Sequence, residues 1–257
     1  MAQSQRREYL IGYLLQKRPE YAGLLIPMGE EEQRRLLRSL MNLRPPAPIS
    51  GEFLRVQDAY FQERLKERGV TKLEALTPVQ PGLYLWQGDI TTLEVDAIVN
   101  AANSGMTGCY VPCHGCIDNA IHTYAGMQLR LECAEIIRKQ GHEEETGHAK
   151  ITGGYNLPCR YVLHTVGPIV SGTLTKEHEQ QLASCYRSCL DLAAENNCES
   201  LAFCCISTGE FHFPNEKAAE IAVETVKQWQ ARHPQQLEVI FNVFKNSDRE
   251  IYEQLLG

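Results

Sequence analysis

The segment DAIVNAA, residues 96–102, is short, apolar and rich in residues that favour β-strands. Segments of the same kind recur on both sides of it: LYLWQ (83–87), AKITGGY (149–155), YVLHTV (161–166), LAFCCIS (201–207) and EVIFNVF (238–244). Such runs are expected of strands that are buried on both faces of a sheet. Helical segments lie between them, near residues 119–138, 178–196, 215–232 and 247–256. The alternation predicts an α/β fold with a mostly parallel sheet that is covered by helices on both sides.

Residues 1–75 have a different pattern and are predicted to form a helical extension of the α/β domain, which then occupies residues 76–257. Leucine and isoleucine recur at helical spacing over residues 10–15 and 36–43, and a third helix is predicted from about residue 52 to residue 68. We expect this extension to pack against the domain or to shape its substrate site.

The composition bounds the class of protein. The chain has 257 residues, of which 43% are hydrophobic and 22% are charged, as is ordinary for a soluble globular protein. The formal net charge of −7 argues against nucleic-acid binding, because a nucleic-acid partner needs a basic face. No apolar run reaches the roughly 18 residues that a membrane span requires, and the first residues make a poor signal peptide. We therefore expect a cytoplasmic protein with neither a nucleic-acid nor a membrane partner, whose ten cysteines are thiols or metal ligands rather than disulfides.

The run GCYVPCHGCIDNAIH, residues 108–122, carries the strongest chemical signal, and we interpret it as the active site. Thiolate and imidazole are the ligands that zinc prefers, and this spacing lets one short loop bring several of them to one ion. A set of three protein ligands leaves an open position for water or substrate, as in catalytic zinc sites. The spacing alone does not decide whether Cys109 or Cys113 joins His114 and Cys116. Cys113 and Cys116 also form a C-x-x-C pair, but the thioredoxin-like context of a redox pair is missing.

Three further motifs follow predicted strands, namely GDI (88–90), NAAN (100–103) and STGEFHFP (207–214). The asparagine amides suit sugar hydroxyls, and the glycine-containing loop offers backbone N–H groups to a diphosphate. Each motif alone is also compatible with an ordinary turn. The loop lacks the lysine of a GxxxxGK[ST] motif, which argues against hydrolysis of a nucleoside triphosphate. Since ligands of such sheets bind at the carboxyl ends of the strands, we expect these motifs to meet there.

Five motifs occur in a fixed order along the chain: GDI, VDAIVNAAN, IDNAIH, GHAKITGGYNLPCRYVLHTVGP and STGEFHFP. In this order they resemble the macrodomain family, whose fold binds ADP-ribose. The resemblance covers residues 83–257 and implies a three-layer α/β/α macrodomain with a mixed, mostly parallel central sheet. The pattern GCYVPxHxCIDN, together with a helical N-terminal extension, is similar to the zinc-dependent macrodomains of microbes. Those proteins are protein-ADP-ribose hydrolases, often encoded beside a sirtuin-type ADP-ribosyltransferase.

The resemblance also implies roles for single residues. It implies one zinc ion per chain, bound by Cys109, His114 and Cys116, with Cys113 at a position that varies. Asp118 is the implied catalytic residue, either as a general base or as the group that orients the water. Zinc-free hydrolases of the family carry glycines where His114 and Cys116 stand, so their scheme of water activation does not transfer unmodified.

The implied contacts to ADP-ribose extend from the adenine to the distal ribose. They are Asp89 and Ile90 at the adenine, Ser207, Thr208, Gly209, Glu210 and Phe211 at the diphosphate, and Asn103, Ile117 and Asp118 at the distal ribose.

The resemblance therefore predicts a zinc-dependent hydrolase that releases ADP-ribose from a mono-ADP-ribosylated protein, with acidic side chains as the favoured linkage. The implied partners are ADP-ribose, the modified protein and a sirtuin-type ADP-ribosyltransferase. Three alternatives use the same residues differently: a non-catalytic reader of ADP-ribose, an O-acetyl-ADP-ribose deacetylase, and an interaction module that is stapled by zinc and needs no ligand. The Cys-His-Cys cluster and Asp118 count against the reader.

Overall fold

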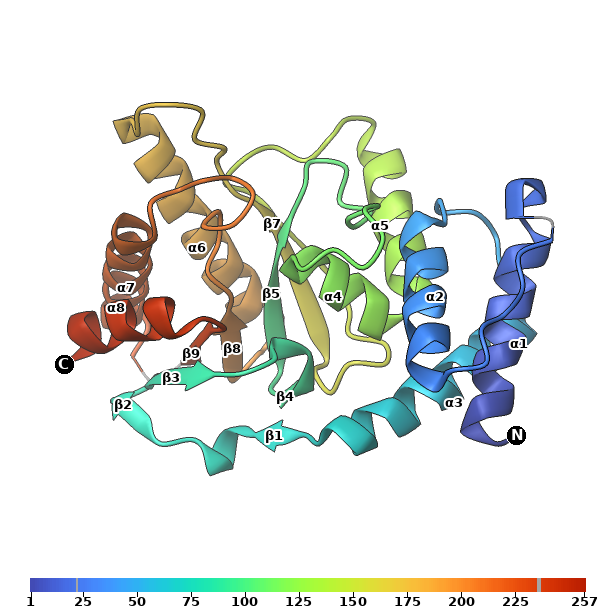
Figure 1. Ribbon diagram of the computed structural model, residues 1–257. Coiled ribbons are helices and arrows are strands. Elements are labelled where there is room, and N and C mark those ends of the chain that lie inside the picture. The colour runs from blue at the N-terminus through green and yellow to red at the C-terminus, as the bar shows by residue number, and fades with distance from the viewer. Residues whose placement is uncertain (22, 235–236) are drawn as a thin grey trace.

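A seven-stranded sheet forms the centre of the protein in the computed structural model, which describes residues 1–21, 23–234 and 237–257 (Figure 1). The strands lie in the order β2 (Pro78–Gln80), β3 (Leu83–Gln87), β9 (Glu238–Val243), β8 (Ser200–Phe203), β5 (Ala97–Ala102), β7 (Tyr161–Val166) and β6 (Ala149–Gly153). The inner strands from β3 to β7 are parallel, whereas the edge strands β2 and β6 are antiparallel to their neighbours. The prediction of a mixed, mostly parallel sheet is confirmed.

Helices cover the sheet on both sides (Figure 1). On one side lie α6 (Lys176–Glu195), α7 (Asn215–Arg232) and α8 (Asn246–Leu256). On the other side lie α4 (Ile117–Ala125) and α5 (Met127–Gln140), and beside them the three helices of the extension, α1 (Gln3–Gln16), α2 (Glu30–Leu43) and α3 (Gly51–Arg68). Within the described residues, no helix combines the length and the apolar character that crossing a membrane requires.

Several short elements lie between the long helices and strands of the described residues. Strand β1 (Thr71–Lys72) pairs in parallel with β4 (Leu93–Glu94). Three 3-10 turns are η1 (Pro19–Tyr21), η2 (Leu73–Ala75) and η3 (Ile90–Thr92). These elements and strand β2 escape prediction from the sequence, because two or three residues are too few to show a periodic pattern.

The helix predicted over residues 119–138 is wrong as a single element, because the chain breaks at Gly126 into α4 and α5. Gly126 has a φ angle of +98°, which other residues rarely adopt. A Cβ atom on it would lie 2.5 Å from Nε2 of Gln57 in α3. Oε1 of Gln57 accepts a hydrogen bond from the Met127 N–H at 2.8 Å. The break therefore forms where α3 meets the two helices.

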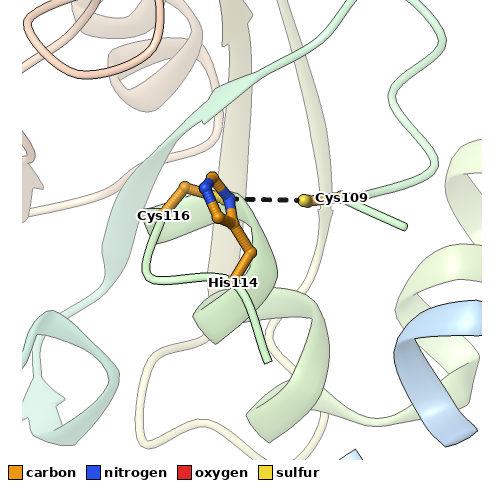
Figure 2. A group of neighbouring side chains, drawn as sticks. All are labelled: Cys109, His114 and Cys116. Atoms are coloured by element: carbon orange, nitrogen blue, oxygen red, sulfur yellow. Dashed lines mark hydrogen bonds between the residues drawn. The ribbon is translucent and has the colours of Figure 1, made fainter. Parts of the chain in front are cut away.

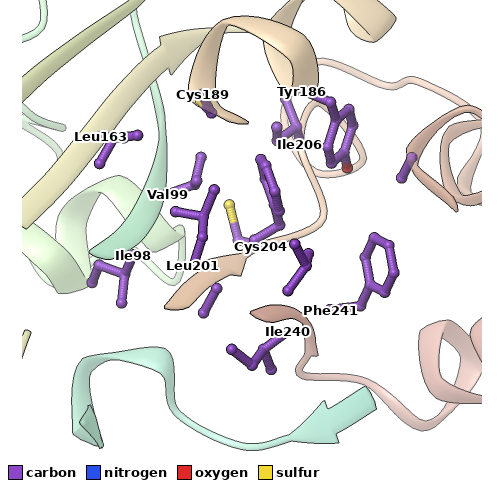
Figure 3. Close-up of a cluster of buried hydrophobic side chains, with 14 of the residues drawn as sticks. Ile98, Val99, Leu163, Tyr186, Cys189, Leu201, Cys204, Ile206, Ile240 and Phe241 are labelled. Atoms are coloured by element: carbon purple, nitrogen blue, oxygen red, sulfur yellow. The ribbon is translucent and has the colours of Figure 1, made fainter. Parts of the chain in front are cut away.

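Two hydrophobic clusters stabilise the protein. The larger one covers both faces of the sheet and includes the fully buried side chains of Ile98, Val99 and Phe241 (Figure 3). Since neighbouring residues of a strand point to opposite faces, this sheet needs helices on both sides. The smaller cluster lies among the helices of the extension, and Met127 at the start of α5 joins it. The extension thus shares its core with the helix that follows the Gly126 break.

Most cysteines lie in the core. All ten are free thiols, and the buried ones are Cys133, Cys159, Cys185, Cys189, Cys198 and Cys204. These six residues pack as small hydrophobic side chains, whereas Cys205 is only partly buried. Burial raises the pKa of Cys204 to about 12, so its thiol stays protonated.

Asp96 joins the amino ends of three parallel strands. Its backbone carbonyl accepts hydrogen bonds from the N–H groups of Arg160 and Tyr161, both at 3.0 Å, where β7 begins. Its carboxylate accepts from the N–H groups of Glu199 at 2.7 Å and Ser200 at 3.2 Å, where β8 begins, and from the Arg160 guanidinium at 3.0 Å. Burial acts to raise the pKa of Asp96, but these donors outweigh it and hold the pKa below its ordinary value.

Replacing Asp96 with asparagine should lower the free energy of unfolding by about 1–3 kcal/mol near neutral pH, because charge-assisted hydrogen bonds are lost. The pKa of Asp96 is lower in the folded than in the unfolded chain. Its contribution is therefore present above the unfolded value of about 3.9 and is lost as the pH falls through the folded value. Urea unfolding of both proteins, near neutral pH and again well below the folded pKa, checks this. An undiminished difference at the lower pH would contradict the assignment.

Candidate active site

The carboxyl ends of the parallel strands converge at one edge of the sheet. Asp89 follows β3, Asn103 follows β5, and the loop 204–214 follows β8. The Val170 N–H, after β7, donates to the carbonyl of Phe211 at 2.9 Å and so fixes this loop to the neighbouring segment. The motifs therefore meet at the edge where ligands of such sheets bind.

The segment 103–116 between β5 and α4, here called the metal loop, carries the predicted zinc ligands (Figure 2). The donor atoms of Cys109, His114 and Cys116 all lie within 4.8 Å of one another. Sγ of Cys109 is 3.6 Å from Nδ1 of His114. Cys113 is not part of this group, since its Sγ contacts α2. Two sulfurs and one imidazole nitrogen form a donor set that fits zinc, and three donors leave a fourth position open.

Cys116 has a second role as the N-cap of α4. Its backbone is extended, with φ −80° and ψ 158°, and its Sγ accepts a hydrogen bond from the Asn119 N–H at 3.4 Å. This cap explains why the helix begins at Ile117, earlier than predicted. Burial raises the pKa of the Cys116 thiol to about 12. The thiol can therefore bind a metal only by giving up its proton.

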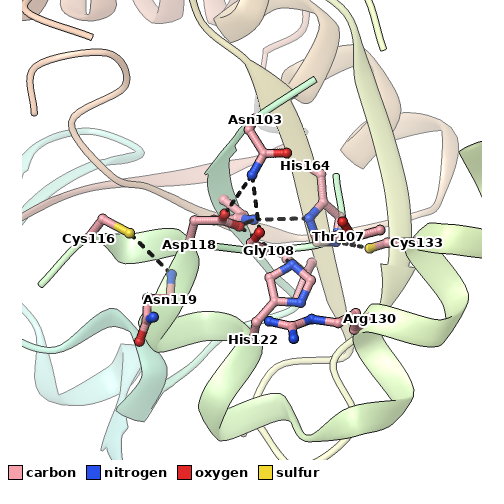
Figure 4. Close-up of polar contacts among 12 residues, drawn as sticks. Asn103, Thr107, Gly108, Cys116, Asp118, Asn119, His122, Arg130, Cys133 and His164 are labelled. Atoms are coloured by element: carbon pink, nitrogen blue, oxygen red, sulfur yellow. Dashed lines mark hydrogen bonds and ion pairs between the residues drawn. The ribbon is translucent and has the colours of Figure 1, made fainter. Parts of the chain in front are cut away.

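Asp118 lies in the first turn of α4 and is only 5% exposed (Figure 4). Nδ2 of Asn100 donates to its Oδ1 at 2.8 Å, and Nδ2 of Asn103 donates to its Oδ2 at 3.3 Å. Burial raises the pKa of this carboxyl to about 6, although the hydrogen bond from Asn100 acts to lower it. A carboxyl with such a pKa can accept a proton near neutral pH.

Asn100 is buried, contrary to the expectation that both asparagines of NAAN offer amides to a sugar. It is 0% exposed within β5, whereas Asn103 is only partly buried. Its amide nitrogen lies 2.8 Å from Oδ1 of Asp118 and 3.1 Å from Nδ1 of His164. Asn100 therefore positions Asp118, and Asn103 is the asparagine that a ligand can reach.

A second group of donors, His122, Cys133 and His164, lies buried behind this network (Figure 4). Their donor atoms also lie within 4.8 Å of one another. Both nitrogens of His164 are already used, however, because Nδ1 faces Asn100 and Nε2 lies 2.9 Å from Oγ1 of Thr152. Burial lowers the pKa of His164 to about 3 and that of His122 well below its ordinary value. We interpret the group as neutral packing behind Asp118.

Asp89 is held by a residue that the sequence did not single out. Its Oδ1 accepts hydrogen bonds from the N–H and Oγ1 of Thr91, at 3.0 and 2.6 Å. Its Oδ2 accepts from Nη2 of Arg68 at 2.5 Å, and the same guanidinium lies 3.8 Å from the ring centre of Tyr124. Arg68 is the last residue of α3, so no local pattern connects it with the GDI motif. The Asp89 side chain remains 42% exposed.

The loop 204–214 reaches the metal loop. Ser207 and His212 have φ angles of +65° and +55°, so the chain turns sharply between them. Gly209 and Glu210 are exposed at its tip, whereas Phe213 is buried. Oε1 of Glu210 lies 3.4 Å from Nε2 of His114. The predicted diphosphate loop and the predicted zinc ligands are therefore neighbours.

Phe244 lies at the same end of the sheet, although no sequence motif pointed to it. The strand predicted to run through Phe244 ends at Val243, and the Phe244 side chain is 76% exposed. Its carbonyl accepts a hydrogen bond from Nε2 of Gln87 at 3.2 Å. Gln87 is the last residue of β3 and lies two residues before Asp89, so Phe244 lies beside the end of β3. An aromatic residue at the carboxyl end of a buried strand is the signal that would have found it.

Comparison with known proteins agrees with this architecture. A family model described as the Macro domain matches residues 99–222. A protein-ADP-ribose hydrolase of Treponema medium is 59% identical over 100% of both chains. A protein-ADP-ribose hydrolase of Staphylococcus aureus (strain MSSA476) is 49% identical over 97% of this chain and 94% of that protein.

Solved structures give the same result. The crystal structure of the Trypanosoma brucei macrodomain in complex with ADP-ribose is similar with a TM-score of 0.67 and 33% identity, over 85% of this chain and 95% of that chain. The expected fold is thereby confirmed. On the sequence and the fold together, this chain belongs to the macrodomain family.

Proposed function

We propose that the protein is a zinc-dependent hydrolase that removes mono-ADP-ribose from modified proteins. The full-length relatives named protein-ADP-ribose hydrolase support the hydrolase class. One observation carries the proposal: three zinc-type donors and the buried Asp118 carboxyl meet around the start of α4, beside the predicted diphosphate loop. A non-catalytic reader would need the binding loops but neither of these features.

ADP-ribose would bind along the carboxyl edge of the sheet. The exposed part of the Asp89 carboxylate would accept a hydrogen bond from the adenine amino group, with the Ile90 amide beside it. The side chain of Phe244 would stack on the adenine ring. Backbone amides of residues 207–211 would hold the diphosphate. Asn103 and Ile117 would hold the distal ribose. These remote interactions would position the reacting bond beside the metal loop.

Cys109, His114 and Cys116 would hold the zinc ion. Zinc in an open three-ligand site would polarise a ribose or carbonyl oxygen, or lower the pKa of a bound water. His114 turns Nδ1 to Cys109 and Nε2 to the carboxylate of Glu210. Histidines that bind metals commonly donate their second N–H to such an acceptor, which supports Nδ1 as the ligand atom.

Asp118 would orient the attacking water or accept its proton. The reaction adds water across the bond between the distal ribose and the modified side chain, and it yields ADP-ribose and the unmodified side chain. Asn100 and Asn103 each donate to one oxygen of Asp118, so the direction of its remaining lone pairs is set before substrate binds. Most of a carboxyl with a pKa of about 6 is ionised at neutral pH, as a base requires.

Linkage to acidic side chains, a sirtuin-type partner enzyme and a cytoplasmic location stay predictions from the family resemblance. Hydrolysis of O-acetyl-ADP-ribose would use the same groups. Turnover of that compound and of a modified protein, measured side by side, would separate the two reactions.

Removing the metal should abolish release of ADP-ribose from a protein that is mono-ADP-ribosylated on acidic residues. Zinc added back to the chelated protein should restore release, because the three donors would again hold the ion. Chromatographic detection of free ADP-ribose measures the effect. Equal release before and after verified zinc loss would make the metal structural, and binding of ADP-ribose without release from either sample would favour a reader.

Replacing Asp118 with asparagine should lower kcat by about 10²–10⁴-fold, because the amide cannot accept the proton of the attacking water. Zinc content and ADP-ribose affinity should stay near those of the wild type. Asp191→Asn is the matched control, since this carboxylate accepts a hydrogen bond from Trp229 in a different part of the fold. Full turnover by the zinc-loaded Asp118 variant would refute the assignment.

Replacing Phe244 with alanine should weaken ADP-ribose binding by about 1–3 kcal/mol, the range measured for stacking of a base on an aromatic ring. Calorimetric titration with ADP-ribose tests this. Tyr155→Ala is the control, because Tyr155 is also an exposed aromatic residue. It follows β6, which is antiparallel to β7 and therefore ends beside the amino ends of the parallel strands, far from Asp89. Equal affinity of the Phe244 variant and the wild type would remove Phe244 from the adenine site.

A further inference from the structure

Helix α2 presents a polar face to the metal loop. Arg35, Arg38, Ser39 and Asn42 recur at the spacing that places residues on one side of a helix. All four contact the metal loop or the first turn of α4, three through side chains and Arg35 through its carbonyl. Leu37, Leu40 and Met41 of the same helix pack instead in the core of the extension. Figure 1 shows α2 standing directly beside α4.

Arg38 makes the most extensive of these contacts. Its Nη2 donates to the carbonyl of His114 at 2.9 Å. Its Nε and Nη2 also donate to Oδ1 of Asn119 at 3.0 and 2.7 Å. One guanidinium therefore joins the main chain of a proposed zinc ligand to the helix that carries Asp118.

Asn119 connects Arg38 with two further residues of the metal loop. Its backbone N–H donates to Sγ of Cys116 at 3.4 Å, and its Nδ2 donates to the carbonyl of Val111 at 3.0 Å. With Arg38 on Oδ1, the fully buried amide side chain is hydrogen-bonded at both ends. The position of Asn119, and with it that of Cys116, depends on a residue of the extension.

Asn42 and Ser39 hold the same loop at Cys113. Cys113 has a φ angle of +52°, an uncommon conformation that needs support from its surroundings. Oδ1 of Asn42 accepts a hydrogen bond from the Cys113 N–H at 2.9 Å, and the Ser39 hydroxyl lies 3.2 Å from the Cys113 sulfur. The turn that precedes His114 is thus formed against α2.

We propose that Arg38 is a positioning residue of the metal site, through which helix α2 holds the metal loop in its binding geometry before zinc arrives. The inference deepens the proposed function and rests on it. Contacts outside the ligand set commonly change metal affinity or activity by about 10–100-fold, because they fix the orientation of the ligands. The apolar packing of the extension uses other residues of α2, namely Leu37, Leu40 and Met41.

The test compares the full-length wild type with Arg38→Ala, Arg38→Lys and Arg35→Ala. Zinc affinity is measured by competition with a chromogenic chelator, ADP-ribose affinity by calorimetry on the zinc-free proteins, and folding by thermal denaturation. Arg35 is the matched control, because it lies one turn earlier on α2, its side chain is exposed, and only its carbonyl contacts the loop.

Arg38→Ala should bind zinc about 10–100-fold more weakly than the wild type and lose kcat in parallel, while ADP-ribose affinity stays within about twofold. Arg38→Lys keeps the charge but cannot reach both acceptors, so its zinc affinity should lie between those of Arg38→Ala and the wild type. Arg35→Ala should bind zinc as the wild type does. If Arg38→Ala does not fold, the zinc affinity of Arg38→Lys tests the proposal.

Three results would overturn the inference. Wild-type zinc affinity in both Arg38 variants would overturn it alone and leave the proposed hydrolase untouched. Equal losses of zinc affinity, ADP-ribose affinity and thermal stability would reduce Arg38 to a packing residue. A wild-type chain that binds no zinc would contradict the metal centre of the proposed function and overturn the inference with it.

Discussion

The hydrogen bond between the Asn119 N–H and the sulfur of Cys116 is the constraint on which the candidate site depends. A helix must satisfy the backbone donors of its first turn, and here a cysteine does so in place of the usual hydroxyl or carboxylate. The start of α4 is thereby tied to the end of the metal loop. Asp118 follows in the same turn, so a proposed metal ligand and a proposed base share one rigid frame. Asn100, His122 and His164 are buried behind Asp118 and act on a carboxyl that the helix has already placed.

The fold could be predicted in its main parts because the strands and long helices show their patterns within single segments. Residues 161–166 and 215–232 coincide with β7 and α7. The break at Gly126 could not be predicted in this way, because it depends on the approach of Gln57 from a distant helix. A glycine in an apolar helical run is compatible with a continuous helix until that neighbour is known.

The candidate site shows the same difference between local motifs, which could be predicted, and contacts from distant segments, which could not. The zinc-type donors and the loop after β8 are local motifs, and the structure brings them together as expected. Residues that act across the fold left no local signal. Arg68 reaches Asp89 from the end of α3, and Arg38 reaches the metal loop from α2. The choice between Cys109 and Cys113 also depends on α2, where the Ser39 hydroxyl and the Arg35 carbonyl contact the Cys113 sulfur.

The hydrophobic clusters and the polar contacts divide the molecule differently. By its apolar core, the extension is a nearly separate body that shares Met127 with the rest. Through Arg68 and Arg38, however, the extension also contacts Asp89 and the metal loop. An extension could be exchanged between relatives or trimmed to obtain a minimal domain. Either change would keep every side chain of the family motifs. It would remove Arg38 and Arg68, however, which hold the metal loop and Asp89 in place. The smallest transferable unit of this chain is accordingly the sheet domain together with the whole extension, because Leu10, Ile11 and Leu14 of α1 complete the core on which α2 and α3 pack.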